Sequence, residues 1–139
     1  MTDKAREVKS SMKNQNNKGF TLAELLIVVA IIGVLVAISI PIFTSQLEKA
    51  REATDIANIR AAYAEASANA LTTETYPVEI ETQNVMQSTG AVDKITSESV
   101  GPWATSNITI TKGQKVKVTI TVDSSGNATA SLSGGATVK

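Results

Sequence analysis

The 139-residue chain contains no cysteine and no histidine, and these two absences remove much of the usual chemistry of active sites. Without cysteine there is no disulfide and no thiolate that could act as a nucleophile or a metal ligand. Histidine is the commonest general base and the commonest metal ligand, so no plausible pair of nucleophile and base is left. The composition therefore argues against an enzyme and predicts neither a cofactor nor a bound metal.

The formal net charge is zero, but the charges are distributed unevenly along the chain. Residues 1–19 hold five basic and two acidic side chains, so this segment carries +3 and the remainder carries −3. The mildly acidic remainder gives no reason to expect nucleic acid as the main ligand. A basic flank before an apolar span stays cytoplasmic, so the part of the chain beyond the span is predicted to face outward.

Charged residues are missing from Leu25 to Leu47, a stretch long enough to cross a bilayer as a helix. An ordinary secretory signal peptide has a shorter apolar core, and its small-residue cleavage site follows that core. Here Gly19 precedes the apolar run, and Glu24 lies in its first turns. Burying an ionised carboxylate in hydrocarbon is costly unless it has a partner, so a simple membrane anchor leaves Glu24 unexplained.

The stretch from Lys18 to Phe43 resembles the processing site and N-terminal helix of a type IV pilin precursor. It combines the cleavage-site glycine, a phenylalanine, a glutamate and the apolar run. The resemblance implies that a prepilin peptidase cuts between Gly19 and Phe20 and methylates the new amine of Phe20. It also implies that Glu24 neutralises the N-terminal amine of a neighbouring subunit and fixes the axial register, with snorkelling to the lipid headgroups as the alternative role.

Gly33 and Pro41 interrupt the apolar run, and both disfavour a regular helix. Membrane helices tolerate either residue, which is the plainer interpretation. The resemblance implies instead that the segment from Gly33 to Pro41 melts when subunits pack into a filament. The leader, residues 1–19, is long for a chain that matures to phenylalanine. Mixed features of this kind resemble Gram-positive pilins, so a Gram-positive type IV major pilin is the predicted placement.

Helical periodicity after the apolar run, followed by alternation near the C-terminus, predicts an α+β fold. The resemblance implies the pilin "lollipop", in which one long N-terminal helix packs by its C-terminal half on a three- to four-stranded antiparallel sheet. The expected segments are a removable basic cytoplasmic leader, an apolar transmembrane and filament-core helix, the amphipathic half of the same helix, a connecting αβ-loop, and the sheet of the head. Their bounds are 1–19, 20–43, 44–71, 72–104 and 105–139.

Two side-chain stripes on the amphipathic half of the helix compete for the contact with the sheet. One stripe, from Leu47 to Leu71, consists mainly of alanine, and the other carries Ile56, Ile59 and Tyr63. The alanine stripe is expected to face the sheet and the second stripe to contact other subunits. The reverse assignment is equally consistent with the sequence.

Smaller features complete the prediction for the head. Arg51 is spaced to form surface ion pairs with both Glu48 and Asp55. The connecting loop is expected to hold a short helix near 83–87. Trp103 either anchors this loop on the sheet or serves as an aromatic binding residue.

Alternation of apolar residues near the C-terminus predicts three short strands, over 108–110, 116–122 and 128–132. The segments 112–114 and 123–127 have the composition of hairpin turns. Together they predict an antiparallel three-stranded meander laid on the helix.

The predicted function is structural: a pilin that is cleaved, N-methylated and polymerised into an extracellular type IV pilus for adhesion, motility or biofilm formation. The expected partners are other pilin subunits, the prepilin peptidase, the assembly platform with its ATPase, and the cell membrane that holds the precursor. One alternative is a pseudopilin of a type II secretion or DNA-uptake machine. A more distant one is a monomeric, membrane-anchored surface binding protein.

Overall fold

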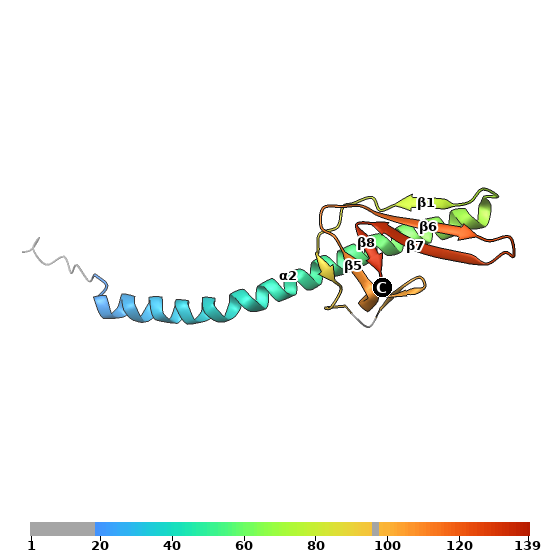
Figure 1. The fold of residues 1–139 in the computed structure, drawn as a ribbon. Coiled ribbons are helices and arrows are strands. Elements are labelled where there is room, and N and C mark those ends of the chain that lie inside the picture. Colours follow the sequence, from blue (N-terminus) through green and yellow to red (C-terminus); the bar gives the residue numbers. More distant parts are fainter. Residues whose placement is uncertain (1–18, 96–97) are drawn as a thin grey trace, which may run out of the picture. The chain divides into compact units, whose positions relative to one another are not determined.

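A computed structural model describes residues 19–95 and 98–139, so the predicted leader lies outside the described residues except for Gly19. A long helix is followed by short antiparallel strands, which confirms the predicted α+β fold (Figure 1). The chain divides between Ile40 and Pro41 into two compact units.

Helix α2 spans Leu22–Thr72 and contains an 18-residue window that is apolar and long enough to cross a membrane. None of that window is buried inside the structure, so its apolar surface needs cover from lipid or from other chains. Pro41 lies inside the helix, where it lacks the N–H that would bond to the carbonyl of Ala37. The helix nevertheless continues through Gly33 and Pro41, so melting of this segment stays a prediction about the filament.

The half of α2 that follows Pro41 buries one stripe of side chains against the strands. Its members are Glu52, Asp55, Ile56, Ile59, Ala62 and Ala66. The alanine stripe from Leu47 to Leu71 is exposed, so the expectation that it faces the sheet is wrong. Isoleucine side chains remove more apolar area from water than alanine does, and the helix turns its larger apolar residues inward.

The first sheet has the strand order β1-β6-β7, with antiparallel pairing throughout. These strands span Val78–Glu81, Val116–Val122 and Ala128–Gly134. The inward-facing Val118 and Ile120 of β6 pack on Ala62 and Ala66 of the helix. The central strand and its hairpin with β7 are thereby confirmed.

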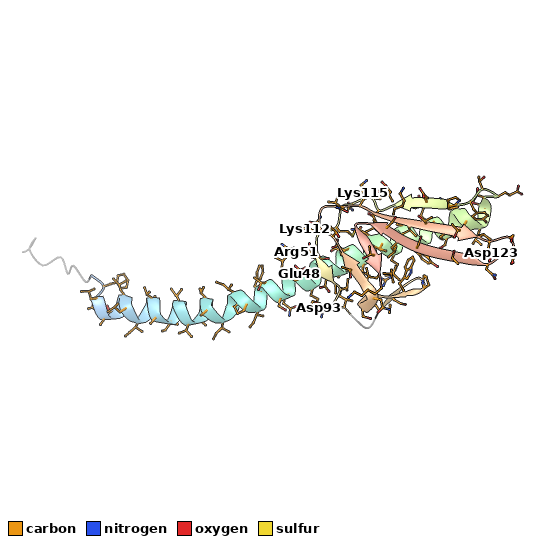
Figure 2. All side chains as sticks on the ribbon, viewed as in Figure 1. Glu48, Arg51, Asp93, Lys112, Lys115 and Asp123 are labelled. Atoms are coloured by element: carbon orange, nitrogen blue, oxygen red, sulfur yellow. The ribbon has the colours of Figure 1, made fainter. Side chains whose placement is uncertain are left out.

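Asp123 stabilises the tip of this hairpin, where Figure 2 labels it. Its Oδ1 accepts the backbone N–H groups of Ser125 at 2.8 Å and Asn127 at 2.9 Å. The bonds from Asn127 and Ser125 hold the pKa of the Asp123 carboxyl below its usual value.

The second sheet has the order β2-β5-β8, with strands at Gly90–Ala91, Ile108–Ile110 and Ala136–Val138. A separate two-stranded hairpin pairs β3, Ser99–Val100, with β4, Trp103–Ala104, and a 3₁₀ turn at Thr105–Asn107 leads into β5. The larger core cluster lies between this sheet and the helix. It contains Ile56, Ile59, Met86, Val92, Val100, Ile108, Ile110, Val116 and Ala136.

Strand pairing differs from the predicted meander, because β5 pairs with β8 and β2 and not with β6. The segment 112–114 therefore joins two sheets. Gly134 and Gly135 make this possible, since β7 leaves its sheet there in close contact with the segment before β6. A Cβ on Gly134, whose φ is +76°, would meet the Lys115 carbonyl oxygen at 2.7 Å, and one on Gly135 would meet that of Gln114 at 2.7 Å.

The segment predicted as a connecting loop, 72–104, contains strands β1 to β4. The short helix expected near 83–87 is absent from the described residues of this segment. Backbone bonds to β6 and its preceding turn hold this stretch extended. Thr82 donates to the Val116 carbonyl at 2.8 Å, and Met86 donates to the Gln114 carbonyl at 2.9 Å.

Candidate functional site

The predicted cleavage bond lies in exposed backbone immediately before helix α2. Gly19 and Phe20 precede the first helical residue, Leu22, and 85% of Phe20 is exposed. A peptidase needs a scissile bond that it can bind outside regular secondary structure, and this bond meets that requirement.

Thr21 and Glu24 form a reciprocal cap at the start of α2. The Thr21 N–H donates to Glu24 Oε2 at 2.8 Å, and the Thr21 hydroxyl donates to the same oxygen at 3.0 Å. In return, the Glu24 N–H lies 3.2 Å from Thr21 Oγ1. This is the capping box, in which the side chain at the third helical position reaches back to the residue before the helix.

The cap directs the Glu24 carboxylate toward the beginning of the helix, where the macrodipole favours negative charge. The carboxylate accepts the N–H of Thr21, which is the residue next to the predicted new amino terminus at Phe20. Gly33 and Pro41 lie farther along the helix and do not contribute to this site. Thr21 was not among the predicted site residues, although the pattern Thr-x-x-Glu before an apolar run is a sufficient signal for this cap.

Replacing Thr21 by valine should loosen the first turn of α2, because the hydroxyl that accepts the Glu24 N–H is lost. Loss of such a cap costs about 1 kcal/mol of helix stability. We expect faster amide hydrogen exchange at residues 22–25 of the full chain in lipid nanodiscs. Thr21→Ser keeps the hydroxyl and should retain the original rates; equal rates in the valine and serine variants would contradict the cap.

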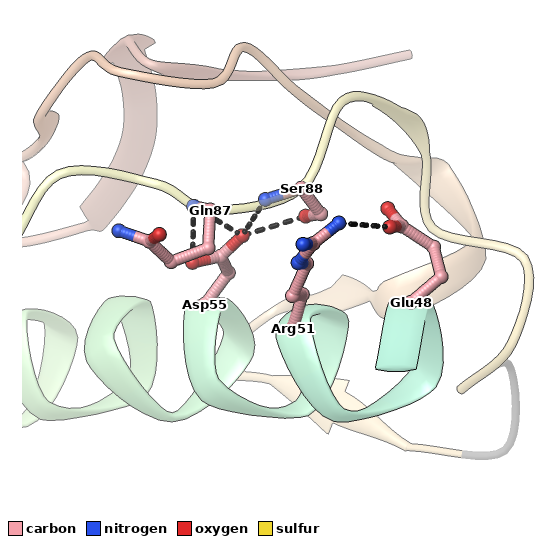
Figure 3. A network of polar contacts seen from close by, with 5 residues as sticks. All are labelled: Glu48, Arg51, Asp55, Gln87 and Ser88. Carbon is pink, nitrogen blue, oxygen red and sulfur yellow. Dashed lines mark hydrogen bonds and ion pairs between the residues drawn. The ribbon is translucent and has the colours of Figure 1, made fainter. Parts of the chain in front are cut away.

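Asp55 joins the connecting segment to the helix in the second unit (Figure 3). The side chain is completely buried, and its two oxygens accept the Gln87 N–H at 2.8 and 2.9 Å. Oδ2 also accepts the Ser88 N–H at 2.7 Å and the Ser88 hydroxyl at 2.6 Å. The predicted ion pair between Asp55 and Arg51 is therefore wrong. Of the two predicted partners of Arg51, only Glu48 pairs with it, at 3.3 Å.

Glu52 makes a second attachment one helical turn earlier. Its Oε2 accepts the Lys94 N–H at 2.9 Å, and only 4% of the residue is exposed. At the surface beside it, the Lys94 ammonium lies 3.0 Å from Asp93, and that ion pair lowers the pKa of Asp93 and raises that of Lys94. We call Glu52 and Asp55 the acidic clamp. It positions the head, and none of its bonds involves the N-terminal site.

The N-terminal site lies within a segment that matches a known family. Residues 14–40 match the family described as "Prokaryotic N-terminal methylation motif", a range that includes Gly19, Phe20, Glu24 and Gly33. No solved structure matches the chain.

Three curated relatives are similar to parts of the chain. The type IV major pilin protein PilA of Myxococcus xanthus is 48% identical over 50 residues, and the type IV narrow pilus major component PilA5 of Thermus thermophilus is 48% identical over 56. The fimbrial protein EcpB of Eikenella corrodens is 56% identical over 34 residues. These matches cover 36%, 38% and 24% of this chain, and 23%, 48% and 21% of the relatives' own lengths. The chain thus carries a prepilin N-terminal methylation motif and is homologous to type IV major pilins over 36 to 38% of its length.

Proposed function

We propose that this protein is a structural pilin subunit, made as a membrane-inserted precursor and polymerised into an extracellular type IV pilus. The observation that carries the proposal is the exposed apolar segment of α2, with one capped carboxylate at its start and an accessible glycine–phenylalanine bond before it. Such a segment suits two successive environments: the bilayer for the precursor and the filament core for the mature subunit. The role is structural, as it is for the relatives named as pilus components.

Processing follows from the chemistry of the first residues. A prepilin peptidase cuts between Gly19 and Phe20, and the freed amine of Phe20 is methylated. Gly19 presents no side chain to the enzyme, and removing the basic leader takes away the charge that holds the N-terminus at the cytoplasmic face. The assembly platform and its ATPase then move the subunit from the membrane into the growing filament.

Glu24 supplies the charge that the new amino terminus requires. A lone ammonium or carboxylate is strongly unfavourable in an apolar core, whereas an ion pair transferred together loses much less. The cap already holds the Glu24 carboxylate at the N-terminal end of its own helix. In the filament it pairs with the Phe20 amine of a neighbouring subunit, and the pairing sets the axial register.

Gly33 and Pro41 delimit the part of the helix that melts in the filament. Proline removes one backbone hydrogen bond within this part. In addition, the Ser39 hydroxyl already donates to the Leu35 carbonyl at 2.7 Å, a type of bond that weakens and bends helices. The segment is therefore less costly to unwind than an alanine-rich helix of equal length.

Mass spectrometry of sheared surface filaments tests the proposal directly. The N-terminal peptide should begin at Phe20 and carry a methyl group on its amine, while the membrane precursor retains the leader. Electron microscopy of the same fraction should show long fibres. Surface material that begins at Met1, or an unmethylated Phe20 found only in monomers, would contradict the pilin proposal, and short stubs would point to a pseudopilin.

A further inference from the structure

All tyrosine and tryptophan side chains of the chain line one groove in the head. The sequence holds two tyrosines and one tryptophan: Tyr63 on α2, Tyr76 after the helix, and Trp103 on β4. The groove lies between the last turns of α2, the β3–β4 hairpin and strands β6 and β7; it is open to solvent and has a volume of about 730 Å³. Ligand pockets span roughly 300–1,000 Å³, so the volume suits a small ligand.

We propose that this groove binds an uncharged saccharide. None of its lining residues, all within the described part of the chain, carries a charge at neutral pH. An anionic or cationic ligand would therefore lose its hydration without gaining an ion pair. Asp123, at the tip of the β6–β7 hairpin that lines the groove, is not itself a lining residue and is engaged by the donors of its own turn. The absence of charged lining residues thus favours a neutral ligand.

The aromatic walls are held in place by the fold. The Tyr63 and Trp103 rings pack edge to face, with centroids 5.6 Å apart and planes at 74°, and both rings contact the core clusters. Gly101, with φ of +55°, lies against the Tyr63 ring; a Cβ there would come within 2.6 Å of Cζ. Tyr76 is 37% exposed. Rigid, partly exposed aromatic faces attract the C–H faces of sugar rings at little cost in side-chain entropy.

Two of the hydroxyl groups that line the groove, those of Ser67 and Tyr76, are oriented as acceptors toward a ligand. The Ser67 hydroxyl donates its hydrogen to the Tyr63 carbonyl at 2.7 Å, and the Tyr76 hydroxyl donates to the Ala70 carbonyl at 2.6 Å. Their remaining lone pairs can accept hydrogen bonds from a ligand. A ligand rich in O–H donors with apolar C–H faces meets both requirements, and a neutral saccharide has both. This site belongs to the head alone and does not depend on polymerisation.

Trp103 offers a direct test, because it is the only tryptophan and it lines the groove. The full chain in lipid nanodiscs, free of glycoside detergents, is titrated with maltotriose, cellotriose and chitotriose while tryptophan fluorescence is recorded. At least one trisaccharide should give a saturable change with half-saturation in the millimolar range or below. Choline serves as the cationic probe and sialyllactose as the anionic probe.

Two variants locate the binding in the groove. Tyr76→Ala removes an aromatic wall, and Ala128→Leu fills the groove from an exposed position on β7; each should weaken binding at least about tenfold. Val85→Ala removes an exposed apolar side chain elsewhere and should leave binding unchanged. Near-UV circular dichroism checks that each variant is folded.

Several outcomes would overturn the proposal. These are no fluorescence change with any neutral trisaccharide at its highest soluble concentration, equal binding by all variants, or binding of choline or sialyllactose alone. A change that depends on protein concentration and not on sugar would assign the groove to a second copy of the chain. None of these results bears on cleavage or on fibre formation.

Discussion

Filaments should disappear from the surface of cells whose protein carries Glu24→Gln, while the precursor still inserts and is still cut after Gly19. Glutamine at this position can close the same capping box with Thr21, so the start of α2 keeps its structure. The substitution removes the charge and leaves the cap. The amine of Phe20 would then have to enter the apolar filament core without a counter-ion.

Immunoblots of sheared and membrane fractions measure the effect. The amount in the sheared fraction should fall at least about a hundredfold, and the membrane pool should persist or rise. Thr21→Val is the matched comparison, because it weakens the cap and keeps the carboxylate; it should reduce filaments far less than Glu24→Gln does. Normal filaments from Glu24→Gln would remove the charge-pairing mechanism, and equal losses in the two variants would assign the effect to the cap.

The features that could be predicted from the sequence are those set by local pattern. The long helix follows from apolar length and alanine content, and its C-terminus at Thr72 lies one residue beyond the predicted end at Leu71. Strand β6 follows from strict alternation of apolar residues from Val116 to Val122, and the turn beginning at Asp123 specifies its hairpin with β7.

The features that could not be predicted depend on contacts between distant residues. Spacing made Asp55 a candidate surface partner of Arg51, yet its actual partners, Gln87 and Ser88, follow it by 32 and 33 residues. The sequence did not distinguish which of the two helix stripes would be buried. The stripe with Ile56 and Ile59 is buried because these side chains join the larger core cluster of the head. Strands β5 and β6 lie in different sheets, and β7 leaves the sheet of β6 at Gly134, in close contact with the Lys115 backbone. No local periodicity of the sequence encodes this contact.

Loss of the Asp55 carboxylate should be the most damaging single change to the head. Replacement by alanine leaves three donors without their acceptor: the two buried donors of Ser88, its N–H and its hydroxyl, and the partly buried N–H of Gln87. Hydrogen bonds to a charged group contribute about 1.5–3 kcal/mol each, and buried donors without a partner add a penalty. We expect Asp55→Ala to lower the free energy of unfolding by at least about 3 kcal/mol. For a head of this size that corresponds to a fall in Tm of roughly 10–20 °C.

Thermal unfolding of the full chain in lipid nanodiscs, followed by the fluorescence of Trp103, measures this loss. Asp55→Asn distinguishes charge from shape: its amide N–H₂ would face donors where an oxygen now accepts, so it should destabilise the head nearly as much as alanine does. Arg51→Ala is the control one turn away, where the half-buried, solvent-accessible pair with Glu48 contributes at most about 1 kcal/mol. If Asp55→Ala unfolds within 2 °C of Arg51→Ala, a shift expected from only about 0.5 kcal/mol, the clamp does not hold the connecting segment. A Tm of Asp55→Ala far below that of Arg51→Ala would mean that the connecting segment stays on the helix chiefly because the buried Asp55 carboxylate accepts its backbone N–H groups.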